Sequence, residues 1–231
     1  MASRSILYAA LAGLKNAMNG LITGTQIEQI SEKINRFAIS SAIATAVAYA
    51  IPGASLLAVV TQTGIIWALY LEINKVIGLS VKENTLKFLG SAIMTNLVNN
   101  FGAFIVSNVT AGVLAWLLPG VGSVAAFLIG TGVGYVCTYT SAVVYLKFLT
   151  SLKKEKGSMN FDDSDFTKRI IDNVMAGMNI KEAIAEAREA FEEARNNGSI
   201  RAARRNPTCP SCGHPIRLDQ RFCSECGTPV K

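Results

Sequence analysis

Four of the five cysteines stand in two pairs near the C-terminal end, and their spacing is that of a metal site. Cys209 and Cys212 form one C-x2-C pair, and Cys223 and Cys226 form a second pair after ten intervening residues. A structural zinc ion takes four thiolates in a closed tetrahedron, and two such pairs joined by a short hairpin supply them. We therefore predict one structural zinc ion on these four ligands, with no open position for catalysis.

The two pairs stand in the knuckles CPSCG and CSECG, and residues 207–228 resemble the zinc-ribbon family. Gly213 and Gly227 permit the turn that aims backbone amides at the thiolates. Because a ribbon of this size has almost no apolar core, the binding of zinc supplies its folding free energy. We expect His214 at the surface or behind the ligands, since four cysteines already fill the coordination sphere.

Arginines flank and enter this segment, and they suit either phosphates or an acidic partner. They are Arg201, Arg204, Arg205, Arg217 and Arg221. Beyond Phe222 there is no interleaved aromatic platform of the kind that binds nucleic-acid bases. We therefore expect the ribbon to dock a protein rather than nucleic acid.

Catalytic constellations are missing from the sequence. His214 is the one histidine, so neither a Ser/His/Asp nor a Cys/His arrangement is available. Cys137 lies in an apolar run and is expected to be a buried thiol. Asp162, Asp163 and Asp165 suit the positive start of a helix better than a metal site. We predict a protein that is not an enzyme.

Charge is distributed very unevenly along the 231 residues. Half of the residues are hydrophobic and 16% are charged, with a formal net charge of +6. No charged residue occurs between Arg36 and Glu72 or between Lys87 and Lys147. Each of these blocks is interrupted once, at Pro52-Gly53 and at Pro119-Gly120. We predict an all-α fold with two apolar helical hairpins.

Segment lengths and charge placement favour a membrane. Residues 88–118 and 121–146 are each long enough to cross the hydrocarbon layer, whereas residues 37–51 reach only about 22 Å as a helix. Lysines and arginines gather on the N-terminal stretch, the linker and the tail, and the two hairpin turns carry no charge. This pattern predicts that both termini are cytosolic, with lipid as a partner.

Asparagines argue against a simple crossing, because amides in lipid need partners. They are Asn96, Asn99, Asn100 and Asn108. Either they face one another in a bundle, or the segment is two helices broken near residues 99–102. The alternative to a membrane protein is a soluble homo-oligomer that buries the same helices against its own copies.

Small residues predict close helix packing in the second hairpin. Gly120, Gly130, Gly132 and Gly134 let backbones approach as small-x-x-x-small patterns do. Packing within one chain and packing between copies explain the pattern equally well.

The expected organisation has five parts. Residues 1–34 form amphipathic helices, 35–156 the apolar hairpin domain, 157–198 a two-helix stalk, 199–206 a basic linker and 207–231 the zinc ribbon. Within this plan, Thr25 with Glu28 three residues later predicts a capping box for the second helix. The third helix is expected to end near Gly78, and Asn197-Gly198 to end the stalk.

Residues 35–150 resemble the bacterial YcjF-type domain of unknown function, which often lies beside small GTPases. The resemblance is carried by IPGASLLAVVTQTGIIWALYLEINKVIGLSVKEN and LLPGVGSVAAFLIGTGVGYVCTYTSAVVYL. It implies a helical, membrane-associated module that serves a GTPase partner. The chain has no GxxxxGK[ST] phosphate loop, which excludes GTP hydrolysis by this chain.

The predicted function is that of a non-enzymatic, membrane-associated adaptor or self-assembling scaffold whose cytosolic ribbon docks a protein. Two alternatives remain open at this point. One is a pore-forming or membrane-remodelling oligomer built on the glycine-rich hairpin. The other is the soluble homo-oligomeric assembly.

Overall fold

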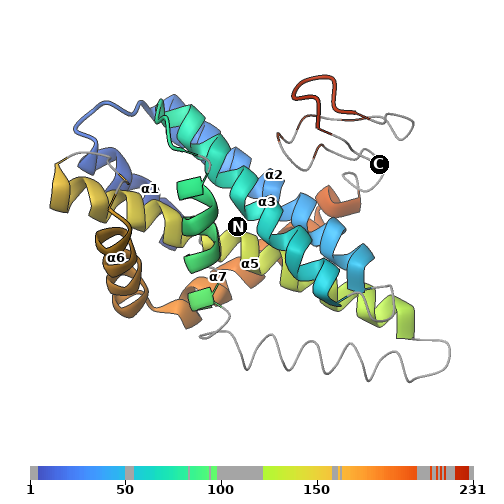
Figure 1. Ribbon diagram of the computed structural model, residues 1–231. Coiled ribbons are helices and arrows are strands. Elements are labelled where there is room, and N and C mark those ends of the chain that lie inside the picture. The colour runs from blue at the N-terminus through green and yellow to red at the C-terminus, as the bar shows by residue number, and fades with distance from the viewer. Residues whose placement is uncertain are drawn as a thin grey trace.

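Helices are the regular elements of this protein. The computed structural model describes residues 5–49, 55–82, 84–93, 95–97, 122–157, 161, 163–201, 209, 212, 214, 216 and 222–228. The helices are α1 (Ser5–Ala17), α2 (Gly24–Tyr49), α3 (Ser55–Ile77), α5 (Gly122–Lys156), α6 (Ser164–Gly177) and α7 (Ile180–Asn196). Residues 84–93 and 95–97 are helical as well. The all-α prediction is confirmed for the described part of the chain (Figure 1).

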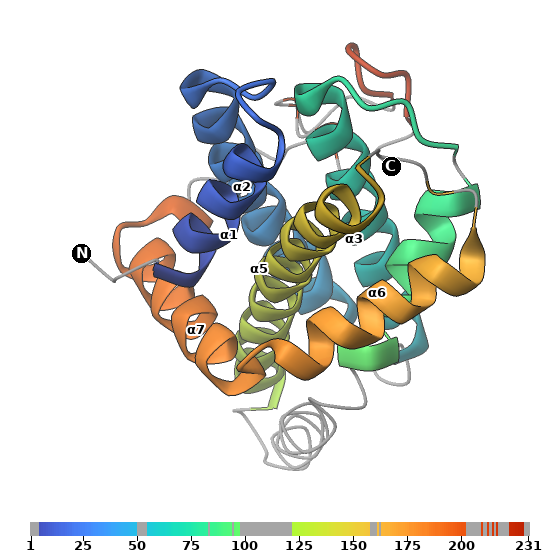
Figure 2. The ribbon, with the colours of Figure 1, turned by 90° about the vertical axis from the view of Figure 1, so that its left-hand side faces the viewer.

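The central element is α5, and the other labelled helices surround it (Figure 2). Its large aromatic side chains are fully buried, among them Tyr135, Tyr139, Tyr145 and Phe148. Tyr145 stacks on Tyr70 of α3 with ring centroids 3.9 Å apart. A helix that is apolar around its whole circumference has to be covered on every side, and the bundle provides that cover.

The two arms of the first predicted hairpin are present as α2 and α3, which pack against each other. The third helix ends where expected, since Gly78 follows it with φ of +73°. The second hairpin is described only in part. Its second arm is α5, whereas most of its first arm, with Asn99, Asn100 and Asn108, lies outside the described residues, as does the turn of the first hairpin at residues 50–54.

Residues 157–198 do not project as the separate stalk that we expected. α6 and α7 pack along α5 and contribute to the same apolar core. Ile170, Ile171 and Ala187 are completely buried there, and Phe191 lies 5.7 Å from the ring of Tyr135. Ile180, Ile184, Ala187, Phe191 and Ala194 recur at intervals of four and three along α7, and α5 packs against this apolar seam.

The capping box of α2 lies two residues earlier than predicted. The Thr23 N–H donates to Gln26 Oε1 at 2.8 Å, and the Gln26 N–H donates to Thr23 Oγ1 at 3.2 Å. Gln26 also donates from Nε2 to the carbonyl of Val76 at 2.6 Å. This bond to the end of α3 favours Thr23 over Thr25 as the cap, because it ties the start of α2 to its neighbour.

Two other predicted helix ends are confirmed. Asp163 caps α6 by accepting from the Phe166 N–H at 2.9 Å. After α7, Gly198 has φ of +80°, a left-handed conformation that glycine adopts without steric cost.

A carboxylate from α7 holds the start of α1. Glu186 is 5% exposed and accepts from the Ile6 N–H at 2.6 Å and the Leu7 N–H at 3.0 Å. The Tyr139 hydroxyl of α5 donates to the same carboxylate at 2.9 Å. Glu186 thus satisfies free amides at the N-terminus of a helix that is about 180 residues away in sequence.

The close approach predicted from the glycines occurs within one chain. A Cβ on Gly134 of α5 would lie 2.6 Å from the Ser41 carbonyl oxygen of α2 and in contact with Thr45 Oγ1. A Cβ on Gly132 would lie 3.6 Å from the Phe191 ring, an ordinary contact. Gly130 is helical but its surroundings are not described, and Gly120 lies outside the described residues.

Membrane-spanning helices are not supported by the described residues. Within them, no helix combines the length and the apolar character that a crossing requires. Most of one predicted crossing, residues 98–118, lies outside the described part of the chain.

Candidate metal centre

The four cysteine side chains meet at one point. All four Sγ atoms of Cys209, Cys212, Cys223 and Cys226 lie within 4.8 Å of one another. Cys209 Sγ is 3.5 Å from Cys226 Sγ, and Cys212 Sγ is 3.6 Å from Cys223 Sγ. A zinc–sulfur bond of about 2.3 Å gives a tetrahedron with edges of about 3.8 Å. The donor set and its size therefore fit a structural zinc ion.

Backbone hydrogen bonds fold each knuckle around its sulfur atoms. The Cys209 N–H donates to the His214 carbonyl at 2.7 Å, and the Cys223 N–H donates to the Thr228 carbonyl at 2.9 Å. The Gly227 N–H closes the second turn on the Cys223 carbonyl at 2.9 Å. Gly227 has φ of +71°, so this turn requires the conformational freedom predicted for it.

Two groups near the second knuckle stabilise thiolate sulfur. The Glu225 N–H donates to Cys223 Sγ at 3.4 Å, and the Thr228 hydroxyl lies 3.2 Å from Cys226 Sγ. The contact with Thr228 lowers the pKa of Cys226 to about 6, whereas burial raises the pKa of Cys212. Zinc displaces the remaining protons when it binds, so affinity for the metal rises with pH.

His214 is not one of the ligands. The metal-binding group within the described residues contains only the four cysteines, and the His214 side chain is 42% exposed. Its Nδ1 lies 4.0 Å from Glu225 Oε2, so the imidazole bridges toward the second knuckle from outside. The expectation of a surface position is confirmed.

Little apolar material surrounds the site. Among its described residues, Cys209 and Cys223 are buried, while Phe222 is 60% exposed. A segment with so small an interior cannot offset its conformational entropy by burial alone. Coordination of zinc is the interaction that orders it.

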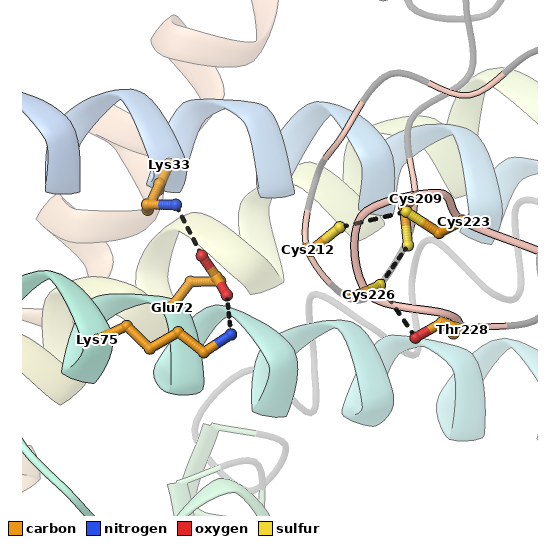
Figure 3. A network of polar contacts seen from close by, with 8 residues as sticks. All are labelled: Lys33, Glu72, Lys75, Cys209, Cys212, Cys223, Cys226 and Thr228. Atoms are coloured by element: carbon orange, nitrogen blue, oxygen red, sulfur yellow. Dashed lines mark hydrogen bonds and ion pairs between the residues drawn. The ribbon is translucent and has the colours of Figure 1, made fainter.

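The ribbon lies beside the α2–α3 hairpin. Thr228 approaches α3, and the cysteine cluster lies near the ion pairs of Glu72 with Lys33 and Lys75 (Figure 3). Glu72 Oε2 is 2.7 Å from Lys33 Nζ, and Glu72 Oε1 is 2.7 Å from Lys75 Nζ. Burial acts to raise the pKa of Glu72, but these two hydrogen bonds outweigh it and lower that pKa.

Sequence reasoning missed Thr228, Glu225 and the Lys33–Glu72–Lys75 network. The only signal for Thr228 was its position two residues after a ligand cysteine. Lys33 and Lys75 belong to the positively charged N-terminal stretch and linker, and that charge pattern does not pair them with one buried carboxylate. Their pairing depends on how α2 and α3 align, which spacing along one helix does not reveal.

The other candidate residues divide into three groups. Arg201 is exposed at the end of a helical turn, while Arg204, Arg205, Arg217 and Arg221 lie outside the described residues. Cys137 is buried as expected, and burial raises the pKa of its thiol to about 12. Asp163 serves as a helix cap.

Comparison with known proteins identifies one part of the chain. A zinc-ribbon domain is matched over residues 208–230, in agreement with the geometry of the four cysteines. No curated protein and no solved structure matches the chain. The resemblance of residues 35–150 to the YcjF-type domain gains no support from these comparisons.

Proposed function

We propose that this chain is a non-enzymatic adaptor, in which a helical bundle carries a zinc-ordered ribbon that docks a protein partner. The observation that carries the proposal is the closed set of four thiolates beside an exposed aromatic side chain. Four ligands leave zinc no open position for a substrate or an activated water. Phe222, 60% exposed next to Cys223, offers the apolar anchor that protein interfaces favour.

The test is a pull-down with the full chain and two matched variants. Phe222→Ser removes the proposed anchor, and Leu21→Ser removes a side chain that is 70% exposed in the α1–α2 loop. A partner retained by the parent and Leu21→Ser but lost by Phe222→Ser, and then reconstituted from two purified proteins, supports the adaptor. Equal recovery by all three proteins would contradict docking through the ribbon.

A second assay, which measures binding to nucleic acid, distinguishes a protein partner of the ribbon from a nucleic-acid partner. A ribbon that binds phosphates would lose affinity steeply as salt concentration rises. We expect the purified chain to show no such salt-dependent binding to short DNA or RNA duplexes. A small GTPase is one partner to include in the reconstitution, on the strength of the YcjF-type resemblance alone.

Attachment to a membrane remains part of the proposal, and its support is the placement of charge. α3 carries no charged residue before Glu72, and α5 carries none before Lys147. The N-terminal parts of α3 and α5 are thus uncharged, and the lysines of these two helices stand near their C-terminal ends. Cell lysis without detergent tests this directly: recovery in the membrane pellet supports attachment, and a defined oligomer in the supernatant favours the soluble assembly.

The pore-forming alternative is not carried forward. It rests on Gly130, Gly132, Gly134 and the asparagines of the second hairpin, and no observation favours it over the adaptor: Gly134 and Gly132 face Ser41 and Phe191 of the same chain.

A further inference from the structure

The ribbon and α3 enclose a groove of about 520 Å³. From α3 it is lined by Gly64, Ile65, Trp67, Ala68 and Leu71, and from the ribbon by Thr228. Gly64, Ala68 and Leu71 are four and three residues apart, so they lie on one face of the helix. The groove therefore runs along one face of α3, and Thr228 of the ribbon forms part of its wall.

This face of α3 has no charge to keep it in water. The helix is uncharged from Ser55 to Leu71. Ile65 and Ala68 are buried in the core of the bundle, whereas Trp67 and Leu71 are half-buried and Gly64 is exposed, so this face is only partly covered in the folded chain. An apolar helix face of this length is normally covered by another part of the protein or by a partner.

The zinc site and the C-terminal end of α3 carry opposite charges. Zinc with four thiolates carries two net negative charges, and Lys75 stands in the last turn of α3 beside the cluster. Lys75 Nζ lies 2.7 Å from Glu72 Oε1, and Figure 3 shows the side chain extending along α3 toward the cysteine cluster. The ammonium group thus lies within the electrostatic field of the metal centre.

We propose that the zinc-loaded ribbon is a clasp that lies over the groove on the uncharged face of α3, with Lys75 as the countercharge of the zinc–thiolate centre. Loss of zinc would then uncover this face without unfolding the bundle. The inference concerns contacts within one chain and does not depend on the identity or existence of an adaptor partner.

The fluorescence of Trp67 can report whether the ribbon leaves α3. The Trp67 indole Nε1 is buried with no hydrogen-bond partner among the described residues, so it will gain water if the ribbon lifts. The chain has two tryptophans, and Trp116→Phe leaves Trp67 as the single source of indole fluorescence. The protein for the test is the full chain with this substitution, loaded with zinc.

Removal of zinc with a chelator should shift Trp67 emission to longer wavelength and increase its quenching by acrylamide. Cys212→Ser in the same background should give the same spectrum without a chelator, and far-ultraviolet circular dichroism should show that the helices persist. Emission and quenching that stay the same after verified zinc loss would overturn the clasp.

Lys75→Gln tests the countercharge, with Lys15→Gln as its control. Both lysines stand in the last turn of a helix, but Lys15 belongs to α1. In competition with a chelator, Lys75→Gln should retain zinc roughly two- to fivefold less well than the parent, as expected for a partly exposed charge pair. Equal retention by Lys75→Gln and Lys15→Gln would remove Lys75 from the proposal.

Discussion

In the helical bundle, α5 is buried along most of its described length by helices on all sides, whereas Cys209 and Cys223 are the only buried side chains among the described residues of the ribbon. Tyr145 and Phe148 have no solvent exposure in the bundle, while Phe222 in the ribbon is 60% exposed. Hydrophobic burial can stabilise the first region without a cofactor. The second has to obtain its stability from zinc. One chain thus contains two regions that should respond to different perturbations.

The largest expected effect is at the zinc site. Cys212→Ser leaves three thiolates and a poor fourth ligand, and zinc binding supplies about 10 kcal/mol or more to such small domains. We expect about one zinc per chain in the parent and close to none in the variant, by atomic absorption. The far-ultraviolet helical signal should be nearly equal. A variant that keeps its zinc would contradict the ligand assignment.

Removal of the Glu186 carboxylate, which caps α1, is the next largest perturbation, and it affects only the bundle. Glu186→Ala leaves two backbone amides and the Tyr139 hydroxyl without their acceptor, which should cost about 3 kcal/mol of unfolding free energy. Glu189→Ala is the control, because this neighbour on α7 is exposed. Urea denaturation followed by circular dichroism measures both. Similar midpoints for the two variants would show that Glu186 is not a structural cap.

A smaller loss is expected where α5 crosses α2. Gly134→Ala places a methyl group against the Ser41 backbone, and overpacking of this kind costs about 2 kcal/mol. Gly132→Ala is the matched control, since its methyl group meets only the movable ring of Phe191. We expect its stability to lie within about 1 kcal/mol of the parent. Thermal unfolding compares the pair, and equal losses would contradict the close approach.

The smallest expected effect concerns the ion pairs beside the ribbon. The pKa of Glu72 is held below its ordinary value of about 4.5, so its stabilising contribution is present above that pH and is lost as pH falls through the lowered pKa. Glu72→Gln should cost about 1 kcal/mol or less at neutral pH, because Lys75 is largely exposed.

Urea denaturation of the parent and Glu72→Gln at about pH 7 and about pH 3 checks the sign of this effect. The difference between them should shrink at the lower pH. Glu28→Gln, at an exposed position of α2, should show no such change. A difference that grows on acidification would mean that Glu72 is not ionised in the folded chain.

The zinc ligands and several helix ends depend on residues that are close in sequence, and short sequence patterns predicted them. The C-x2-C spacing identified all four ligands, and glycine at 78 and 198 marked helix ends. The capping box was misplaced because Thr23-x-x-Gln26 and Thr25-x-x-Glu28 both fit the motif. The hydrogen bond from Gln26 to Val76, fifty residues away, distinguishes them.

The other differences between the predictions and the structure involve contacts between residues that are far apart in the sequence. The apolar residues at intervals of three and four along α7 can be read from the sequence, but the sequence does not say that α5 covers them. The bonds of Glu186 to Ile6 and Leu7 span most of the chain, and no spacing rule connects them. Glycine patterns predicted close packing at Gly134 but left the partner open, which the contact with Ser41 identifies as α2.

Hydrogen exchange measured by mass spectrometry on the full chain, with and without zinc, tests the contrast between the two regions most directly. Removal of zinc should abolish protection in peptides that cover the ribbon and lower it in the part of α3 that lies under Thr228. Peptides from α5 between Tyr135 and Leu152 should exchange at unchanged rates, because their protection depends on burial within the bundle. Loss of protection in α5 on zinc removal would show that the metal stabilises the whole molecule and would contradict the division into two regions.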